Sequence, residues 1–153
     1  MIKQRSFLTY ILLSLITCGI YSIIFWYNYT DDLNRICKGD GKETKNYILV
    51  LILSFITCGI YYWIWMYGIG NRLSENAPRY GARFQENGTT ILLWMLFGSL
   101  ICGIGPFIAI HILIKNINEL ADRNNQLTYV GGFNPQQASG VFNNNQQPPY
   151  NNF

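Results

Sequence analysis

The nine residues LSLITCGIY at positions 13–21 return, with one change, as LSFITCGIY at positions 53–61. A looser copy, GSLICGIG, occupies positions 98–105, so that equivalent glycines fall at positions 19, 59 and 103. A sequence that repeats itself with a period of about 20–50 residues is built from repeated supersecondary units. The repeat therefore predicts three similar units, at about residues 5–37, 45–77 and 88–125.

Each copy of the repeat lies in a stretch of chain without any charged side chain. These stretches run from Ser6 to Thr30, from Asn46 to Asn71 and from Asn87 to Ile114. Only 12% of all residues are charged, whereas a soluble domain carries about 25%. A helix needs about 20 apolar residues to cross a bilayer, and each stretch is longer than that. The composition predicts an all-α integral membrane protein, with a membrane domain over residues 1–125.

Glycine interrupts each uncharged stretch. A helix often ends at a glycine in the left-handed conformation, followed by an apolar residue that packs back on the last turn; the isoleucines at 20, 60 and 104 supply it. A proline after the third glycine suits the first turn of a new helix. We therefore expect each unit to be a helix, a glycine break and a second helix. The residues that define this motif are Thr17, Gly19, Tyr21, Thr57, Gly59, Tyr61, Gly103 and Pro106.

Two arrangements in a membrane fit this pattern. If each stretch turns back at its glycine, three membrane hairpins form and all eleven basic residues lie on one side. If each stretch crosses as one kinked transmembrane helix, the basic residues divide five against six. Cytoplasmic loops carry an excess of Lys and Arg, so the charges favour hairpins with cytoplasmic loops and tail. The hairpin tips would then pack on one another, because lipid cannot solvate free backbone groups.

The chain changes character after each uncharged stretch. Apolar residues continue at helical spacing on one side, as Tyr29, Leu33 and Ile36 do in the first unit. Such a stripe is expected where a helix lies against a partner or a lipid surface. From about residue 126 the sequence is rich in Asn, Gln and Pro and ends in NNNQQPPYNNF. This composition predicts a disordered tail over residues 126–153.

No arrangement typical of catalysis is visible. His111 is the only histidine and stands where the other units have Tyr27 and Tyr67, so we interpret it as an aromatic spacer, with a proton relay as the alternative. No zinc-binding cluster, nucleophile elbow or phosphate-binding loop is recognisable. The basic residues form no cluster of the kind that follows a nucleic-acid backbone. We therefore expect no enzyme, no catalytic, cofactor-binding or metal-ligating residues, no cofactor and no nucleic-acid partner.

A family resemblance rests on a short series of residues. An arginine precedes the first apolar stretch, and a Thr-x-Gly-Ile-Tyr motif, a Trp-Tyr pair and a Leu-Asn pair follow it. Here these are Arg5, Thr17, Gly19, Ile20, Tyr21, Trp26, Tyr27, Leu33 and Asn34. Over roughly residues 3–125 the chain resembles the DUF4234 family of small bacterial membrane proteins. The resemblance implies a location in the bacterial cell membrane and no known activity.

These expectations lead to a hypothesis about function. We expect a structural or interaction role, as a scaffold or a partner-binding subunit in the bacterial cell membrane. Its partners would be membrane lipids, a second copy of the chain or another membrane protein. A small channel or transporter acting as an oligomer is the alternative, which the absence of charged residues from the apolar stretches disfavours.

Overall fold

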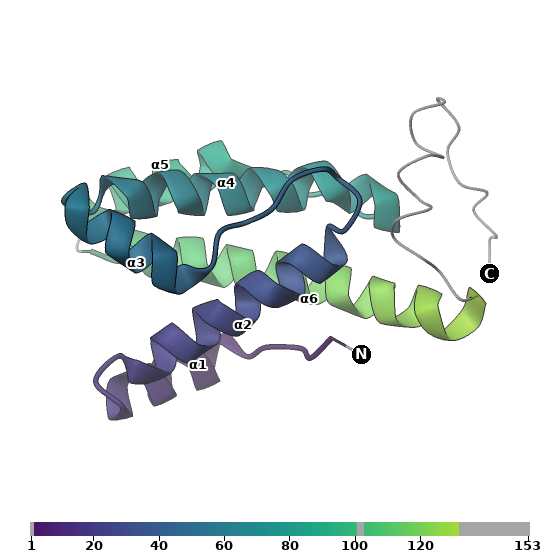
Figure 1. Ribbon diagram of the computed structural model, residues 1–153, viewed down its shortest axis with the longest axis horizontal. Coiled ribbons are helices and arrows are strands. Elements are labelled where there is room, and N and C mark those ends of the chain that lie inside the picture. The colour runs from purple at the N-terminus through teal and green to yellow at the C-terminus, as the bar shows by residue number, and fades with distance from the viewer. Residues whose placement is uncertain (1, 101–102, 132–153) are drawn as a thin grey trace.

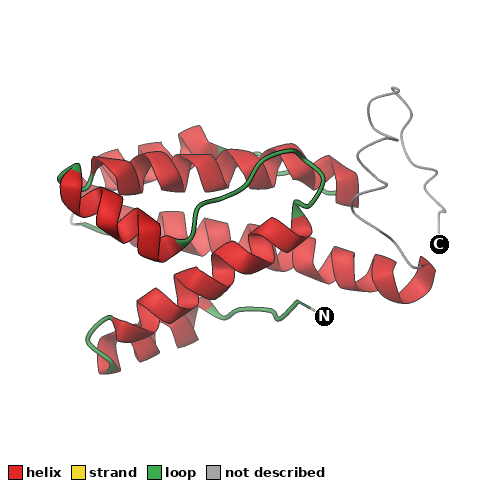
Figure 2. Ribbon diagram, viewed as in Figure 1, coloured by secondary structure: helices red, strands yellow, loops and turns green. Residues whose placement is uncertain are grey.

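The computed structural model describes residues 2–100 and 103–131, and within them every regular element is a helix (Figure 2). The elements are α1 (Phe7–Ile16), α2 (Ile20–Ile36), α3 (Tyr47–Ile56), α4 (Ile60–Asn76), the short 3-10 helix η1 (Ala77–Tyr80), α5 (Gly88–Leu100) and α6 (Gly105–Gly131). Residues 126–131 of the expected tail continue α6. Residues 132–153 of that tail lie outside the described residues.

The helices form three consecutive pairs, α1–α2, α3–α4 and α5–α6. In Figure 1 the ends of α1, α3 and α5 and the starts of α2, α4 and α6 lie at the same end of the molecule, on the left, and the N-terminus lies toward the opposite end. In each pair, the first helix therefore runs toward this end of the molecule, and the second helix runs back from it. The charged residues of the chain belong to the N-terminal segment, the second helices and the loops between pairs.

None of the described helices is both long enough and apolar enough to cross a bilayer. Turns divide the uncharged stretches, so that α1 and α3 have 10 residues each and α2 and α4 have 17. Helix α6 has 27 residues but carries charged side chains from Lys115 onward. The shorter helices are limited by their length. At 1.5 Å per residue these helices measure about 15 and about 26 Å, against a hydrocarbon core of about 30 Å. This finding corrects two expectations. The integral membrane fold is wrong, as hairpins and as kinked transmembrane helices, and so is the expected place in the bacterial cell membrane with cytoplasmic loops and tail.

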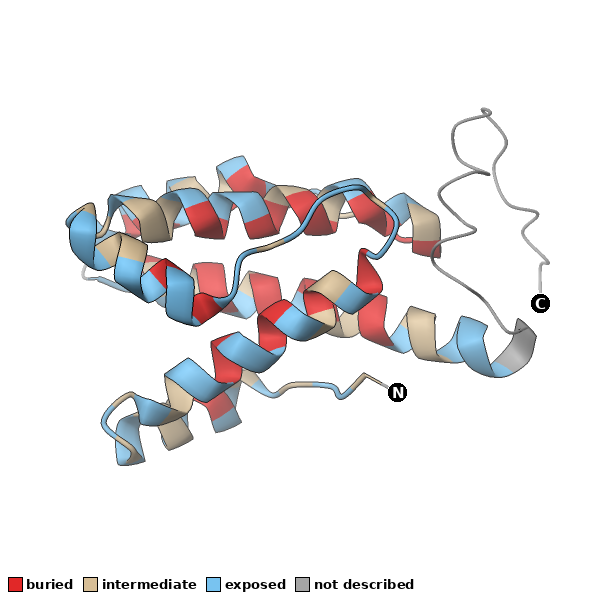
Figure 3. Cartoon of the chain, viewed as in Figure 1, coloured by how far each residue is buried: buried red, intermediate tan, exposed pale blue. Residues whose placement is uncertain are grey.

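The core forms between equivalent faces of the three second helices, α2, α4 and α6, with α6 packed against both of the others. Leu33, Leu73 and Ile117 occupy the same position in their units, and all three are fully buried. One turn earlier, the hydroxyl of buried Tyr29 donates to the carbonyl of Leu113 at 2.9 Å. Figure 3 shows the buried residues along the facing sides of these helices. The apolar stripes therefore cover one another.

Helix α5 packs between α4 and α6 at unusually close range. A Cβ atom built on Gly98 of α5 would lie 2.3 Å from the Cα of Gly105 in α6. At the other end of α5, a Cβ on Gly88 would lie 2.2 Å from the carbonyl oxygen of Tyr67 in α4. Glycine lets two helix backbones approach more closely than any side chain would allow. These contacts place the third pair against the second.

Candidate functional site: the apolar end and the N-terminal pocket

A threonine hydroxyl joins the two helices of the first pair. Thr17 donates to the carbonyl of Leu13 at 2.7 Å and accepts from the backbone N–H of Tyr21 at 3.0 Å. Thr57 repeats both bonds, to Leu53 at 2.8 Å and from Tyr61 at 3.0 Å. One hydroxyl thus adds a second bond to a carbonyl in the last turn of the first helix, and it satisfies a backbone N–H in the first turn of the second helix.

Left-handed backbone reverses the chain at each of these turns. Cys18 and Gly19 have φ angles of 51° and 90°, and Cys58 and Gly59 have 51° and 88°. The N–H of Gly19 donates to the carbonyl of Ser14 at 2.7 Å, which closes the end of α1 in the manner of a Schellman motif. Two successive residues of this kind cannot continue a helix.

The third turn uses other residues. Gly103 has a φ of 71°, and Pro106 is the second residue of α6. Residues 101 and 102 lie outside the described part of the chain. The eight motif residues identified from the sequence therefore lie in three separate turns, which are gathered at one end of the molecule (Figure 1).

Replacing Thr17 or Thr57 by valine is expected to lower the free energy of unfolding by about 1 kcal/mol. The reason is that the backbone N–H of Tyr21 or Tyr61 then loses its acceptor. Thr17→Val and Thr57→Val lie in different turns, so their effects should add. Denaturant unfolding followed by far-ultraviolet circular dichroism measures both. Thr9→Val is the matched control, since the hydroxyl of Thr9 has no hydrogen-bond partner among the described residues. An equal loss in the control would contradict the bridging role.

The three turns present large apolar side chains outward. Phe55 is 90% exposed, Leu100 79% and Leu15 75%. The expected packing of the tips against one another is thus absent from these residues. We call this surface the apolar end, and its exposed side chains are Leu15, Ile16, Ile20, Phe55, Ile56, Ile60, Leu100, Ile104 and Phe107. Large exposed apolar side chains gathered at one end of a molecule suggest an interaction site.

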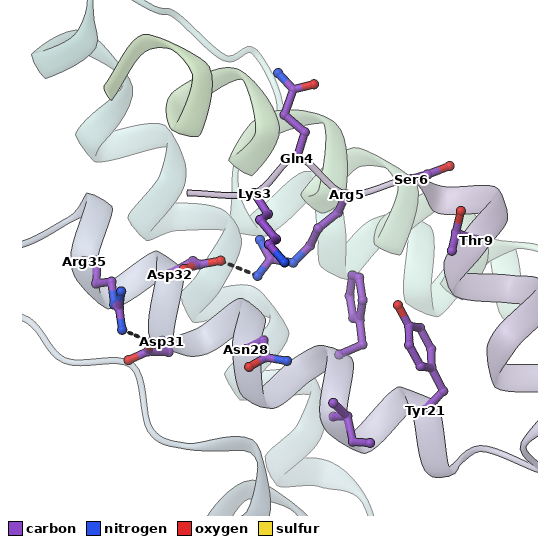
Figure 4. Close-up of a pocket in the computed structure, with 12 residues that line it drawn as sticks. Lys3, Gln4, Arg5, Ser6, Thr9, Tyr21, Asn28, Asp31, Asp32 and Arg35 are labelled. Atoms are coloured by element: carbon purple, nitrogen blue, oxygen red, sulfur yellow. Dashed lines mark hydrogen bonds and ion pairs between the residues drawn. The ribbon is translucent and has the colours of Figure 1, made fainter. Parts of the chain in front are cut away.

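A polar pocket lies beside the first helix pair and extends from Tyr21, near the start of α2, to Arg35, near its end. It has a volume of about 610 Å³ and lies between the N-terminal segment, the start of α1 and one face of α2. We call it the N-terminal pocket. In Figure 4, Lys3 and Arg5 point from the N-terminal segment toward α2, whereas Gln4 points away. This alternation is expected of an extended segment.

Two ion pairs line the N-terminal pocket (Figure 4). Arg5 pairs with Asp32 at 2.5 Å, and both side chains are mostly buried. The guanidinium of Arg5 also lies over the rings of Phe25 and Tyr29, 5.8 and 5.6 Å from their centroids. These contacts hold the cation in place by charge and by its attraction to the ring faces.

Asparagine side chains of α6 hold the N-terminal segment in its extended form. Asn118 accepts from the N–H of Arg5 at 2.8 Å and donates to its carbonyl at 2.6 Å. Asn125 makes the same pair of bonds with Ile2, at 3.0 and 2.9 Å. Asn34 of α2 binds the backbone of Thr44 in the same way, at 2.9 and 3.0 Å. The second helices thus position the segments that precede the first helices.

The described cysteines differ in their surroundings: Cys37 is buried, whereas Cys18 and Cys58 are exposed. Burial raises the pKa of the Cys37 thiol to about 12, so this thiol stays protonated at neutral pH. His111 makes an edge-on contact with the ring of Phe7, with centroids 5.0 Å apart. Within residues 2–100 and 103–131 no three His, Cys, Asp or Glu side chains converge in a way that would hold a metal ion.

Comparison with known proteins identifies a domain in the first half of the chain. Residues 5–75 match the model of a family described as Domain of unknown function (DUF4234). The chain is a DUF4234 domain-containing protein. The DUF4234 match ends within α4, so α5 and α6 lie outside it, although the third unit repeats the pattern of the other two. No curated protein and no solved structure matches the chain.

Sequence reasoning missed the residues that assemble the DUF4234 domain with the third helix pair. The double hydrogen bonds from Asn118 and Asn125 join α6 to the segment before α1. A signal was present, because the Leu33-Asn34 pair of the DUF4234 motif recurs as Ile117-Asn118 in the third unit. Arg5 was recognised as part of the family motif, but nothing in the sequence predicts that it forms an ion pair with Asp32.

Proposed function

We propose that this chain is a structural or interaction protein that attaches to the surface of a lipid bilayer through its apolar end. The observation that carries the proposal is the exposure of large apolar side chains on all three turns, at the same end of the molecule. The attachment would be one-sided, with the charged residues of the second helices outside the hydrocarbon layer.

The order of side chains away from the turns supports lipid as the partner. Beyond the apolar end, exposed aromatic residues follow: Tyr27, Tyr67 and Trp94. Charged residues come next along each second helix, starting at Asp31, Arg72 and Lys115. Aromatic rings with a polar edge prefer the boundary between apolar and aqueous regions of a bilayer. The sequence of apolar, aromatic and charged side chains follows that boundary.

The scarcity of free polar groups at the apolar end favours lipid over a protein partner. A typical protein–protein interface forms about ten direct hydrogen bonds. The apolar end has no charged side chain, and the hydroxyls of Thr17, Thr57 and Ser99 already donate to carbonyls within their own helices. A fluid hydrocarbon surface requires no hydrogen bonds and adapts its shape to three separate turns.

Binding to vesicles tests the proposal. We expect the purified full-length protein to float with phospholipid vesicles in a density gradient. The variant Leu15→Ser/Phe55→Ser/Leu100→Ser removes one exposed anchor from each turn. Because moving one such side chain from water to hydrocarbon contributes about 1.5–3 kcal/mol, the variant should bind at least about 100-fold more weakly.

The matched control is Tyr129→Ser. Tyr129 is 93% exposed and lies on α6, outside the apolar end, so its replacement should leave vesicle binding unchanged. All variants should keep the circular dichroism spectrum of the parent protein, because the replaced side chains are solvent-exposed. Equal flotation of the triple variant would refute lipid attachment. So would a lipid-free oligomer that the same substitutions dissociate, since the apolar end would then bind a second copy.

A further inference from the structure

We propose that the N-terminal pocket binds a phosphate group, either as a free phosphate ion or as the head of a phospholipid. The proposal goes beyond lipid attachment, and it depends on the proposed function only where the phosphate belongs to a lipid. It rests on the cavity between the N-terminal segment and α2, on the charges that line it and on a comparison with its counterpart in the second unit.

The charges of the pocket leave an excess of one cation. Arg5 pairs with Asp32, and Arg35 pairs with Asp31 at 2.8 Å. Lys3 is exposed and has no ion-pair partner in the part of the chain that the structure describes. Its side chain points toward α2, on the same side of the segment as Arg5 (Figure 4). An anion entering the pocket would therefore meet one ammonium group that no carboxylate neutralises.

Hydrogen-bond donors accompany this charge. Ser6, Thr9 and Tyr21, each of which carries a hydroxyl, are among the residues that line the cavity. Ser6 makes no side-chain cap to α1, so the first N–H groups of that helix keep their affinity for an anion. The Nη1 nitrogen of Arg5 is buried and has no hydrogen-bond partner among the described residues.

The site is built before any ligand arrives. Asn118 and Asn125 hold the backbone on both sides of Lys3 by paired hydrogen bonds. The guanidinium of Arg5 is held by Asp32 and by two aromatic rings. A preorganised site loses little conformational entropy when the ligand binds.

The second unit contains the same cavity with different charges. A pocket of about 350 Å³ lies between residues 42–45 and the face of α4 that includes Tyr61 and Trp65. Glu43 stands at the position of Lys3, and Arg72 stands at the position of Asp32. Arg72 directs its donors to Asp40, and Glu43 adds a negative charge at the rim. Lys42 and Lys45 also line this pocket, but Lys42 pairs with Glu75, and the charge of Glu43 offsets that of Lys45. With Asp40 counted as the partner of Arg72, the second pocket has no excess cation, and we therefore assign the phosphate site to the first unit alone.

Titration with inorganic phosphate tests the pocket without lipid. Amide chemical shifts of the Lys3–Thr9 segment should move in a saturable way, with one phosphate bound per chain. Lys3→Gln should weaken binding by about tenfold or more, since a charge-assisted hydrogen bond is lost. Lys3→Glu copies the second unit and should abolish binding. Lys38→Gln is the control, because Lys38 is an exposed lysine outside both pockets.

Vesicles distinguish the two sources of the phosphate. If the group belongs to a lipid, flotation with phosphatidylglycerol vesicles should exceed flotation with phosphate-free galactolipid vesicles, and Lys3→Gln but not Lys38→Gln should remove the difference. Saturable binding of inorganic phosphate without that preference assigns the pocket to free phosphate. The proposal is overturned if neither assay responds to Lys3. The triple serine variant affects flotation on both vesicle types and leaves the phosphate titration unchanged, so a failure of lipid attachment is recognised separately.

Discussion

Arg72→Met is expected to lower the free energy of unfolding by about 3–5 kcal/mol, the usual cost of breaking a buried ion pair by removing one partner. Arg72 is only 5% exposed and Asp40 12%. The Nε and Nη2 nitrogens of Arg72 donate to the two carboxylate oxygens of Asp40 at 2.8 and 3.0 Å. Methionine fills a similar volume but leaves this carboxylate buried without its cation.

The remaining donors of Arg72 join two segments of the chain. Nη1 donates to the side chains of Asn34 and Thr44, and Nη2 also donates to the carbonyl of Lys42. The guanidinium thus ties α4 to α2 and to the loop between α2 and α3. Arg72→Lys should recover little of the loss, because an ammonium group cannot reproduce this planar set of five donors.

Denaturant unfolding followed by circular dichroism measures this effect. Arg35→Met is the matched control, because Arg35 also forms an ion pair, with Asp31 at 2.8 Å, but is 67% exposed. Exposed pairs of this kind contribute about 0–1 kcal/mol. The buried pair would have no special role if the two variants lost the same stability.

Acid should reveal the same interaction. Burial by itself raises the pKa of Asp40, but hydrogen bonds from Arg72, from the N–H of Lys42 and from Asn76 outweigh it and hold the pKa below its ordinary value. A carboxyl with a depressed pKa in the folded state stabilises the fold at pH values above its unfolded pKa of about 3.9. This stability is lost as the pH falls through the lower, folded pKa. Asp40→Asn should remove that part of the acid dependence.

Gly105→Ala is expected to cost about 3 kcal/mol or more, at the upper end of what overpacking costs in a core. A Cβ atom on Gly105 would lie 1.9 Å from the carbonyl oxygen of Trp94 and 2.5 Å from the Cα of Gly98. Both atoms belong to the backbone of α5, so no side-chain rotation relieves the contact. Helix α5 would have to move away from α6.

Three further variants make this prediction specific, with unfolding measured as above. Gly98→Ala should cost a similar amount, because its Cβ would meet the backbone of Gly105 from the opposite side. The double variant should lose less than the sum, since a single separation of the helices relieves both contacts. Gly68→Ala should instead gain about 0.5–1 kcal/mol, because Gly68 lies inside α4 with open space around it and alanine favours a helix. A neutral Gly105→Ala would contradict the close approach of α5 and α6.

Part of the candidate site was predictable from short-range patterns. The apolar residues around the three glycines were recognisable, and they form the apolar end. The N-terminal pocket was not, because Arg5 and Asp32 are separated by 27 positions and Arg5 and Asn118 by 113. Nothing in a single sequence indicates which polar side chains meet across such distances. The glycine breaks were predicted from the sequence, but the expected membrane fold rested on composition along the chain, and no described helix is long and apolar enough to cross a bilayer.

What the amino-acid sequence determined alone is the local structure of each unit. The bonds that end one helix and begin the next connect residues four or five positions apart, as those of Thr17 and Gly19 do, so the repeated motif specifies them directly. Tertiary structure decided which surfaces are covered. The apolar stripes of α2, α4 and α6 are buried because these helices pack against one another. The turns stay exposed because no other part of the described chain packs against them. Burial depends on how whole helices are arranged in space, and the periodicity of apolar residues within one helix does not specify that arrangement.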